Sequence, residues 1–401
     1  MEKWRNTSIP ARIAFGAGGI RFLEIQPGKG DGGAVWVAHL ENERHVLEGL
    51  PTRMPGLEWN ELEMRRRPQI SGIVSMARLY MPNRRRILRL AKLLYCRGLK
   101  VFEVMRVIDL IGYYAHYLEI FKKGSYSLAV MSSHSNPHGI AFNLAARKFK
   151  IPVVLITHGM PIKPLANLAF DLAVVHCEAA KKLYADEGCR IAEAFCHGRK
   201  QDYSQIRNEP YTKPVSVGIF LCKDVNEEVF RSVTETLLQN PKVSNILVRP
   251  HPKNLWFGLD KWIEDKADAR LKRSRSDRSD ADIESVDIVL GGNSSVLIEA
   301  VTGGRPAVYV PGLDYGSSDL HGFVAGGLVG RFEGETFDPN KIWAFHHQAG
   351  WQTIYESYAN IHEDNEDVMT RAAAAMSRLS GSARSILPVE IVDPEPTISS
   401  T

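Results

Sequence analysis

The feature that most constrains this chain is a regular alternation of short apolar runs and amphipathic segments, which occurs twice. Between about 125 and 200, strand-like runs such as YSLAVM and PVVLI flank helix-like segments such as PHGIAFNLAARKF. The alternation restarts at Val215 and continues to about 310. Strand, helix and strand at these lengths predict right-handed crossovers between parallel strands. The sequence therefore predicts an α/β protein with two Rossmann-like domains.

A polar stretch, GRKQDYSQIRNEPYTKP, separates the two alternating regions. We assign 1–200 to an N-terminal, acceptor-binding domain, 201–214 to a linker and 215–345 to a C-terminal domain that binds a nucleotide donor. Residues 346–385 have the pattern of amphipathic helices, and we expect 386–401 to form a disordered tail. A chain of 401 residues is also long for a single hydrophobic core.

Cysteine usage and hydropathy indicate where the protein works. The five cysteines form no CxxC pair and show no zinc-type spacing, which is typical of reduced thiols. No apolar run reaches the roughly 18 residues that span a bilayer. The N-terminus, MEKWRNTSIP, lacks the apolar core of a signal peptide. We therefore expect a cytoplasmic protein.

The net charge of +4 conceals a strongly basic segment at 64–102, which we expect to be helical. It holds eleven of the 50 Lys and Arg residues and none of the 46 Asp and Glu residues. Apolar and basic residues follow each other at roughly helical spacing, which is typical of a helix that lies on an anionic membrane. A solvated basic helix packed on its own domain is the alternative. Nucleic acid is not expected, because no binding module accompanies the charge.

Two polar segments follow strands of the second domain. In RPHPKN, which comes after NILV, Pro250 and Pro252 fix the backbone on both sides of His251, and Arg249 and Lys253 add positive charge. Ligands of parallel sheets bind at the carboxyl ends of the strands. Cations at this edge suit a phosphate or diphosphate. A packed histidine beside a surface arginine is the structural alternative.

The second segment, GGNSSVLIEAVTGG, runs from a strand into a helix. Ser294 or Ser295 can cap this helix, and capping alone explains the pattern. The functional interpretation adds an anion near Asn293 and the two serines, because free amides and the helix dipole favour negative charge. Glu299 then lies close enough to contact ribose hydroxyls. The later loop GLDYGSSDLHG offers further acids at the same edge.

In the first domain, THG places His158 just after a strand, where an imidazole can accept a proton near neutral pH. His134 and His138 follow the preceding strand. Cysteine and carboxylate partners at metal-ligand spacing are missing, so we expect no metal site.

A resemblance to a known family depends on three segments in order: THGMPIKP, RPHPKN and GGNSSVLIEAVTGGRPAVYV. Together they resemble GT-B glycosyltransferases of bacterial surface polysaccharide synthesis, in the branch with CDP-glycerol glycerophosphotransferases, polysialyltransferases and capsule-type Kdo transferases. The resemblance covers about 125–330. It implies two Rossmann-like domains facing across a cleft, C-terminal helices, and metal-independent transfer without a cofactor beyond the nucleotide-activated donor.

The resemblance also implies roles for the candidate residues. His251, Ser294 and Ser295 would hold the donor phosphate, and Glu299 would approach the ribose. His158 would face the acceptor as base or as a second phosphate contact, and His158 and His251 are the candidate catalytic residues. The donor would be linked to CMP or CDP, and the acceptor would be a cell-envelope glycan or lipid-linked glycan at the inner face of the plasma membrane.

Two other functions remain open from the sequence. A UDP-sugar 2-epimerase shares this fold and a similar Gly-Ser segment, although no paired carboxylates for proton abstraction are evident. A non-catalytic nucleotide-binding protein is the third candidate. An epimerase converts a free UDP-sugar without an acceptor, which distinguishes it from a transferase.

Overall fold

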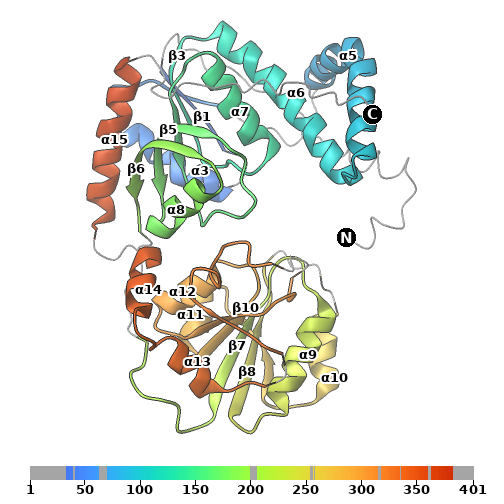
Figure 1. The fold of residues 1–401 in the computed structure, drawn as a ribbon, viewed down its shortest axis with the longest axis vertical. Coiled ribbons are helices and arrows are strands. Elements are labelled where there is room, and N and C mark those ends of the chain that lie inside the picture. The colour runs from blue at the N-terminus through green and yellow to red at the C-terminus, as the bar shows by residue number, and fades with distance from the viewer. Residues whose placement is uncertain are drawn as a thin grey trace, which may run out of the picture.

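The structure, a computed structural model, has two parallel six-stranded sheets with helices on their faces (Figure 1). It describes residues 33–38, 41–62, 70–198, 206–252, 256, 258–314, 318–334, 336–359 and 363–382. The predicted α/β fold class, with two Rossmann-like domains and C-terminal helices, is confirmed. The expected tail at 386–401 and part of the expected linker lie outside the described residues.

The first sheet has the strand order β2-β1-β3-β4-β5-β6, and the second has the order β12-β11-β10-β7-β8-β9. All neighbouring strands in both sheets run parallel. The chain reverses its direction of winding between β1 and β3 and again between β7 and β10. The strands are β1 (Gly33–Val37), β2 (Trp59–Glu61), β3 (Tyr126–Met131), β4 (Val153–Ile156), β5 (Ala169–Val175), β6 (Arg190–Cys196), β7 (Val215–Phe220), β8 (Val243–Arg249), β9 (Leu271–Arg273), β10 (Ile288–Gly291), β11 (Ala307–Tyr309) and β12 (Gly330–Arg331).

The helices between and after the strands cover both faces of each sheet. None of those described is long and apolar enough to cross a membrane. They are α3 (Glu41–Glu48), α4 (Leu50–Arg53), α5 (Ile70–Cys96), α6 (Val101–Lys123), α7 (Pro137–Lys148), α8 (Glu178–Asp186), α9 (Glu227–Leu238), α10 (Leu259–Lys266), α11 (Ser279–Glu284), α12 (Val296–Thr302), α13 (Pro339–Phe345), α14 (Trp351–Ala359) and α15 (Asn365–Ser382).

Local sequence explains where these elements begin. Strand β5, AFDLAVV, is buried along its whole length, as expected for a parallel strand with both faces covered. Helix α7 begins at Pro137, whose ring has the φ of a first helical turn. The side chain of Asn136 accepts a hydrogen bond from the Gly139 amide at 2.9 Å, which satisfies one of the free donors of that turn.

The last helix returns to the first domain. Helix α15 has buried residues at the spacing of one helical face, and among them Met369, Met376 and Leu379 pack in one cluster with residues of β1, β3, β4 and β5. Figure 1 shows this helix, in red, alongside the first sheet. Residues near the C-terminus therefore complete the core of the N-terminal domain.

The two domains share a hydrophobic contact. Met160 and Cys177 of the first domain belong to the same buried cluster as Phe323, Tyr355 and Tyr358. Helix α14 packs on α8 within this contact. The loops at the carboxyl ends of the two sheets are thereby held close to each other.

Candidate active site between the two sheets

Loops at the carboxyl ends of the two sheets are joined by hydrogen bonds. The amide of Lys163, seven residues beyond the end of β4, donates to the carbonyl of Leu320 at 2.9 Å. Next to it, Nδ1 of the buried His321 lies 3.2 Å from the carbonyl oxygen of Pro161. The THG loop of the first domain is thus attached to the loop that follows β11.

Asn293 extends this connection to the Gly-Gly-Asn-Ser-Ser segment. Its side-chain oxygen accepts from the Leu320 amide at 2.7 Å. Its own amide and its side-chain nitrogen donate to the carboxylate of the buried Asp314, at 2.7 and 3.1 Å. Asn293, predicted to contact the ligand, positions the loops in this structure, and Asp314 is its partner.

A glycine before Asn293 is required by this packing. A Cβ atom on Gly292 would lie 2.8 Å from an oxygen of Asp314, closer than non-bonded atoms approach. The amide of Ser294 donates to the Gly292 carbonyl at 2.9 Å, which tightens the turn. The loop is therefore shaped by the Asp314 carboxylate and by its own backbone hydrogen bond.

Ser294, Ser295 and Glu299 lie at the start of α12 and are half-buried. The N-cap residue of α12 is Ser295, whose side chain accepts no capping hydrogen bond. The hydroxyl oxygen of the preceding Ser294 accepts from the Val296 amide at 3.3 Å instead, and so satisfies one free donor of the first turn. The Ser295 hydroxyl donates to Glu299 Oε1 at 3.1 Å. Both hydroxyls could exchange these bonds for bonds to a ligand.

On the first domain, His158 is half-buried beside the end of β3. Its Nδ1 lies 3.4 Å from the hydroxyl of Ser132, the residue that follows that strand. The neighbouring His134 is buried and contacts the Tyr184 hydroxyl at 3.0 Å. Burial, with a smaller effect of the nearby His158, lowers the pKa of His134 to about 4. His134 is therefore neutral at pH 7. Of the two imidazoles, His158 is the more exposed to solvent.

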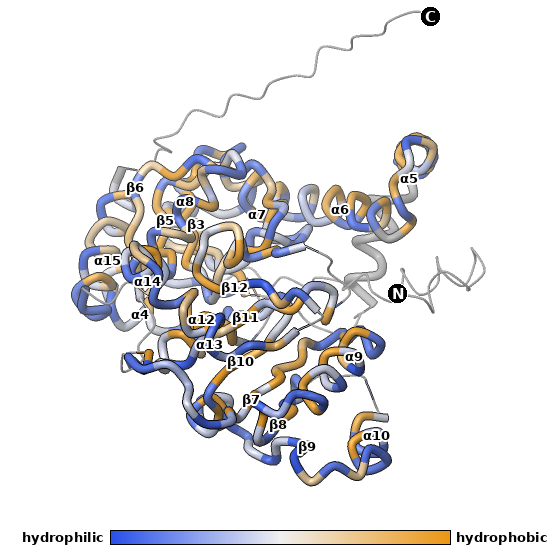
Figure 2. Tube along the Cα trace, turned by 60° about the horizontal axis from the view of Figure 1, so that its bottom comes forward, coloured by the Kyte–Doolittle hydropathy of each residue, from blue (hydrophilic) through white to orange (hydrophobic). Residues whose placement is uncertain are grey.

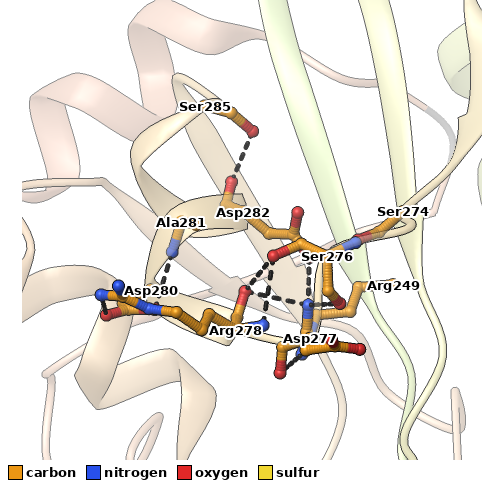
Figure 3. A network of polar contacts seen from close by, with 9 residues as sticks. All are labelled: Arg249, Ser274, Ser276, Asp277, Arg278, Asp280, Ala281, Asp282 and Ser285. Atoms are coloured by element: carbon orange, nitrogen blue, oxygen red, sulfur yellow. Dashed lines mark hydrogen bonds and ion pairs between the residues drawn. The ribbon is translucent and has the colours of Figure 1, made fainter.

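Arg249 has a different environment from the one expected of a phosphate ligand. Its guanidinium donates to the carboxylate of Asp282, to the carbonyls of Ser276 and Arg278 at 3.0 Å, and to that of Asp277 at 3.2 Å (Figure 3). The sequence could not identify these partners, because the polar run that contains them has no periodicity that places it in space. Arg249 holds the loop before α11 in position.

His251 is exposed at a surface pocket of about 500 Å³ beside the ends of β8 and β9. Trp256, Arg273 and Arg275 also line this pocket. Lys253, the third predicted cation of the segment, lies outside the described residues. Arg273 forms an ion pair with Asp260, and Asp277 also lines the pocket, so that the Trp256 ring and Arg275 are what it offers next to His251.

The strand order separates His251 from the two serines. Gly291 of β10 is in register with Phe220 of β7, and Phe220 is in register with Arg249 of β8. Strand β7 therefore lies between the other two, and their ends are about 10 Å apart, twice the spacing between neighbouring strands. This separation is too large for a single phosphate but is within the length of a nucleoside diphosphate.

One functional candidate, Lys223, was not predicted from the sequence. Lys223 is exposed and follows the end of β7 by three residues, at the point where the winding of the second sheet reverses. Such reversals are the usual ligand positions of open parallel sheets. Its neighbour Cys222 has its pKa raised to about 12, first by burial and then by Asp314. The signal was present in the sequence, since VSVGIF ends three residues before Lys223.

Metal-ligating side chains do not gather here. Among the described residues, no group of three or more His, Cys, Asp and Glu side chains is arranged to hold a metal ion. The arrangement offers instead an imidazole on one domain, with a lysine, two hydroxyls and a second imidazole on the other.

No family model and no curated protein matches the chain. Several solved structures are similar to it. They include Staphylococcus aureus MnaA with UDP, at 11% identity over 85% of this chain and 94% of that chain with a TM-score of 0.46. Acinetobacter baumannii MurG has 11% identity over 87% of this chain and 100% of that chain, with a TM-score of 0.47. The calicheamicin glycosyltransferase CalG4 has 11% identity over 89% and 99%, with a TM-score of 0.48.

Proposed function

We propose that the chain is a glycosyltransferase that moves a sugar from a nucleotide-activated donor to an acceptor hydroxyl. The observation that carries the proposal is the hydrogen-bonded path from Lys163 through Leu320 to Asn293. This path fixes the loop of His158 next to the loop of Ser294 and Ser295. A group-transfer enzyme needs such an arrangement, because a base on the acceptor and the charge-stabilising groups on the donor must act at one bond.

The donor would bind along the edge of the second sheet. Ser294 and Ser295 would contact one phosphate, Lys223 would lie beside the next, and His251 would stand at the far end with the pocket that contains Trp256. Glu299 would turn from Ser295 toward the ribose. A nucleoside diphosphate spans the roughly 10 Å between β8 and β10, and the aromatic pocket suits a base.

In the transfer step, His158 would take the proton of the acceptor hydroxyl. The acceptor oxygen would form a bond to the anomeric carbon of the sugar, while the bond from that carbon to the donor phosphate breaks. The electron pair of the broken bond would remain on the phosphate. Lys223, His251 and the serine hydroxyls would stabilise that negative charge, which is the main requirement for catalysis without a metal ion.

The finer assignment follows the motifs. A cytidine nucleotide is the proposed carrier, CDP rather than CMP because only CDP has the two phosphates that this donor position uses, and the transferred group is a sugar or a polyol phosphate. The proposed acceptor is a cell-envelope glycan or lipid-linked glycan.

The first test is a thermal-shift screen with CMP, CDP, UDP and GDP. We expect cytidine nucleotides to raise the melting temperature most, and stabilisation by none of the four would contradict the proposal. Activated donors are then incubated without an acceptor, and the products are separated. Slow donor hydrolysis supports a transferase, whereas conversion of a UDP-sugar at C2 identifies an epimerase. If His158→Ala and His251→Ala both kept full turnover, the site assignment would be wrong.

A further inference from the structure

Helix α5 lies at the outer end of the first domain. It packs mainly on α6, and both views show it away from the two sheets (Figures 1 and 2). Ile87, Leu90 and Leu94 are half-buried and recur at intervals of three and four residues, so that they share one helical face. This face is the one that packing on α6 accounts for.

The exposed side of the helix, opposite this face, carries large apolar side chains at its two edges: Leu88 and Tyr95 at one edge and Leu93 at the other. Leu88 is 67% exposed, Leu93 50% and Tyr95 59%. Only three other large apolar side chains are exposed in the part of the chain that the structure describes, and each is less exposed than Leu93. Half of the set thus lies on two turns of one helix. Large apolar side chains that gather on an exposed helix surface usually mark a site of interaction.

Arg85, Arg89 and Lys92 lie between the two apolar edges. Six exposed basic residues lie on or directly after the same part of the helix: Arg84, Arg85, Arg86, Arg89, Lys92 and Arg97. The segment 64–102 contains no Asp or Glu that could neutralise them. The partner of this face must therefore accept both positive charge and apolar side chains.

We propose that the outward face of α5 between residues 84 and 97 docks on an anionic lipid bilayer. Leu88, Leu93 and Tyr95 would enter the boundary between headgroups and acyl chains, while the arginine stems extend to the phosphates above them. A purely electrostatic partner such as a nucleic acid would leave the leucines in water. The proposal does not depend on the proposed function, because it concerns a surface remote from His158 and Ser294.

The full-length protein is tested for co-sedimentation with vesicles of phosphatidylcholine alone and of phosphatidylcholine with phosphatidylglycerol. We expect binding to the anionic vesicles only. The triple variant Arg85→Glu, Arg89→Glu, Lys92→Glu should weaken this binding on the order of 100-fold, since each cation near an anionic surface contributes about a factor of five. The matched control reverses three exposed lysines elsewhere: Lys148→Glu, Lys213→Glu and Lys341→Glu.

A second variant separates lipid insertion from charge attraction. Leu88→Ser with Leu93→Ser keeps every charge and should weaken vesicle binding at least about tenfold. If this variant binds as tightly as the original chain, the surface is purely electrostatic and the proposal is wrong. Equal binding to both kinds of vesicle, or an equal loss in the control triple, would also overturn it.

Cys96 provides a direct readout, because it is exposed and follows Tyr95, whereas the remaining cysteines are buried or half-buried. A polarity-sensitive fluorophore on Cys96 should shift its emission to shorter wavelength when anionic vesicles are added. An unchanged spectrum with vesicle-bound protein would show that another surface makes the contact, and would overturn the proposal.

Discussion

At the scale of single residues, His346 shows how burial fixes a protonation state. Its Nδ1 lies 2.9 Å from the Ile342 carbonyl, and Nε2 accepts from the Ala307 amide at 3.4 Å. One nitrogen is a donor and the other an acceptor, which only the neutral ring provides. Burial, the largest cause, lowers the pKa of His346 from 6.5 to about 4.

A pH dependence of stability follows. Because the pKa of His346 is lower in the folded than in the unfolded chain, the unfolded chain binds the proton first as the pH falls. The free energy of unfolding should therefore decrease from about pH 6.5 toward about pH 4, by up to about 1.4 kcal/mol per pH unit for this group. Urea titrations of His346→Gln should show a shallower decrease, and the exposed His347→Gln should behave like the original chain.

Lys223 gives a prediction for the site. Lys223→Ala should lower the turnover of the activated donor about 100-fold, because one stabilising charge on the leaving phosphate is lost. It should weaken binding of a nucleoside diphosphate but leave binding of the nucleoside unchanged. Isothermal titration measures both. Lys148→Ala removes an exposed lysine before β4, at the amino edge of the first sheet, and should change neither value. Equal weakening of nucleoside and diphosphate would place Lys223 away from the phosphates.

Among the site residues, the sequence could locate strand ends but not partners. The apolar runs before RPHPKN and GGNSS show that both segments leave strands, which fixes their edge of the sheet. The contacts of Arg249 with 276–282 could not be predicted, because they arise between segments with no repeating pattern. The link between Asn293 and Leu320 is hidden for the same reason.

At the scale of elements, a buried ion pair joins α7 to the first sheet. Arg147 and Asp171 lie 2.8 Å apart, with side chains 3% and 0% exposed. The same carboxylate accepts from the amide of Val153 at 2.8 Å, so that it connects α7, β4 and β5. Removing one partner of a buried pair leaves the other charge out of water without its counter-ion.

Asp171→Ala should therefore lower the free energy of unfolding by about 3–5 kcal/mol. The double variant Arg147→Met with Asp171→Leu should lose much less, because neither charge remains buried. Urea unfolding followed by circular dichroism measures both. A loss below about 1 kcal/mol for Asp171→Ala would show that Arg147 finds solvent or another partner at little cost.

The order of elements within each sheet was only partly accessible from the sequence. The alternation of strands and helices predicts that consecutive strands are parallel, adjacent in the sheet and joined by crossover helices. After β9 the chain could add β10 either beyond β9 or on the other side of β7, and the local sequence pattern does not distinguish these two strand orders. The observed strand order places Lys223 between His251 and Ser294. The position of Lys223 in the site could therefore not be predicted from the local sequence pattern.

At the scale of the whole molecule, the chain crosses between the domains twice. It leaves the first domain after β6, builds the second domain, and returns through α14 to place α15 on the first sheet. The amphipathic pattern of α15 predicts a buried face but does not say which sheet buries it. The first domain is thus completed by a helix that follows the second domain in the sequence.

Met376 tests this dependence. It is fully buried where α15 packs on the first sheet. Met376→Ala should lower the stability of the first domain by about 2–5 kcal/mol, because the cavity is lined by side chains from both ends of the chain. Unfolding should then separate into two transitions, with the second domain melting near its original temperature.

Differential scanning calorimetry and hydrogen exchange at β3 and β10 distinguish the domains. Ser377→Ala, an exposed neighbour on the same helix, is the control. A uniform shift of a single transition would mean that the contact through α8 and α14 couples the domains more strongly than α15 stabilises the first.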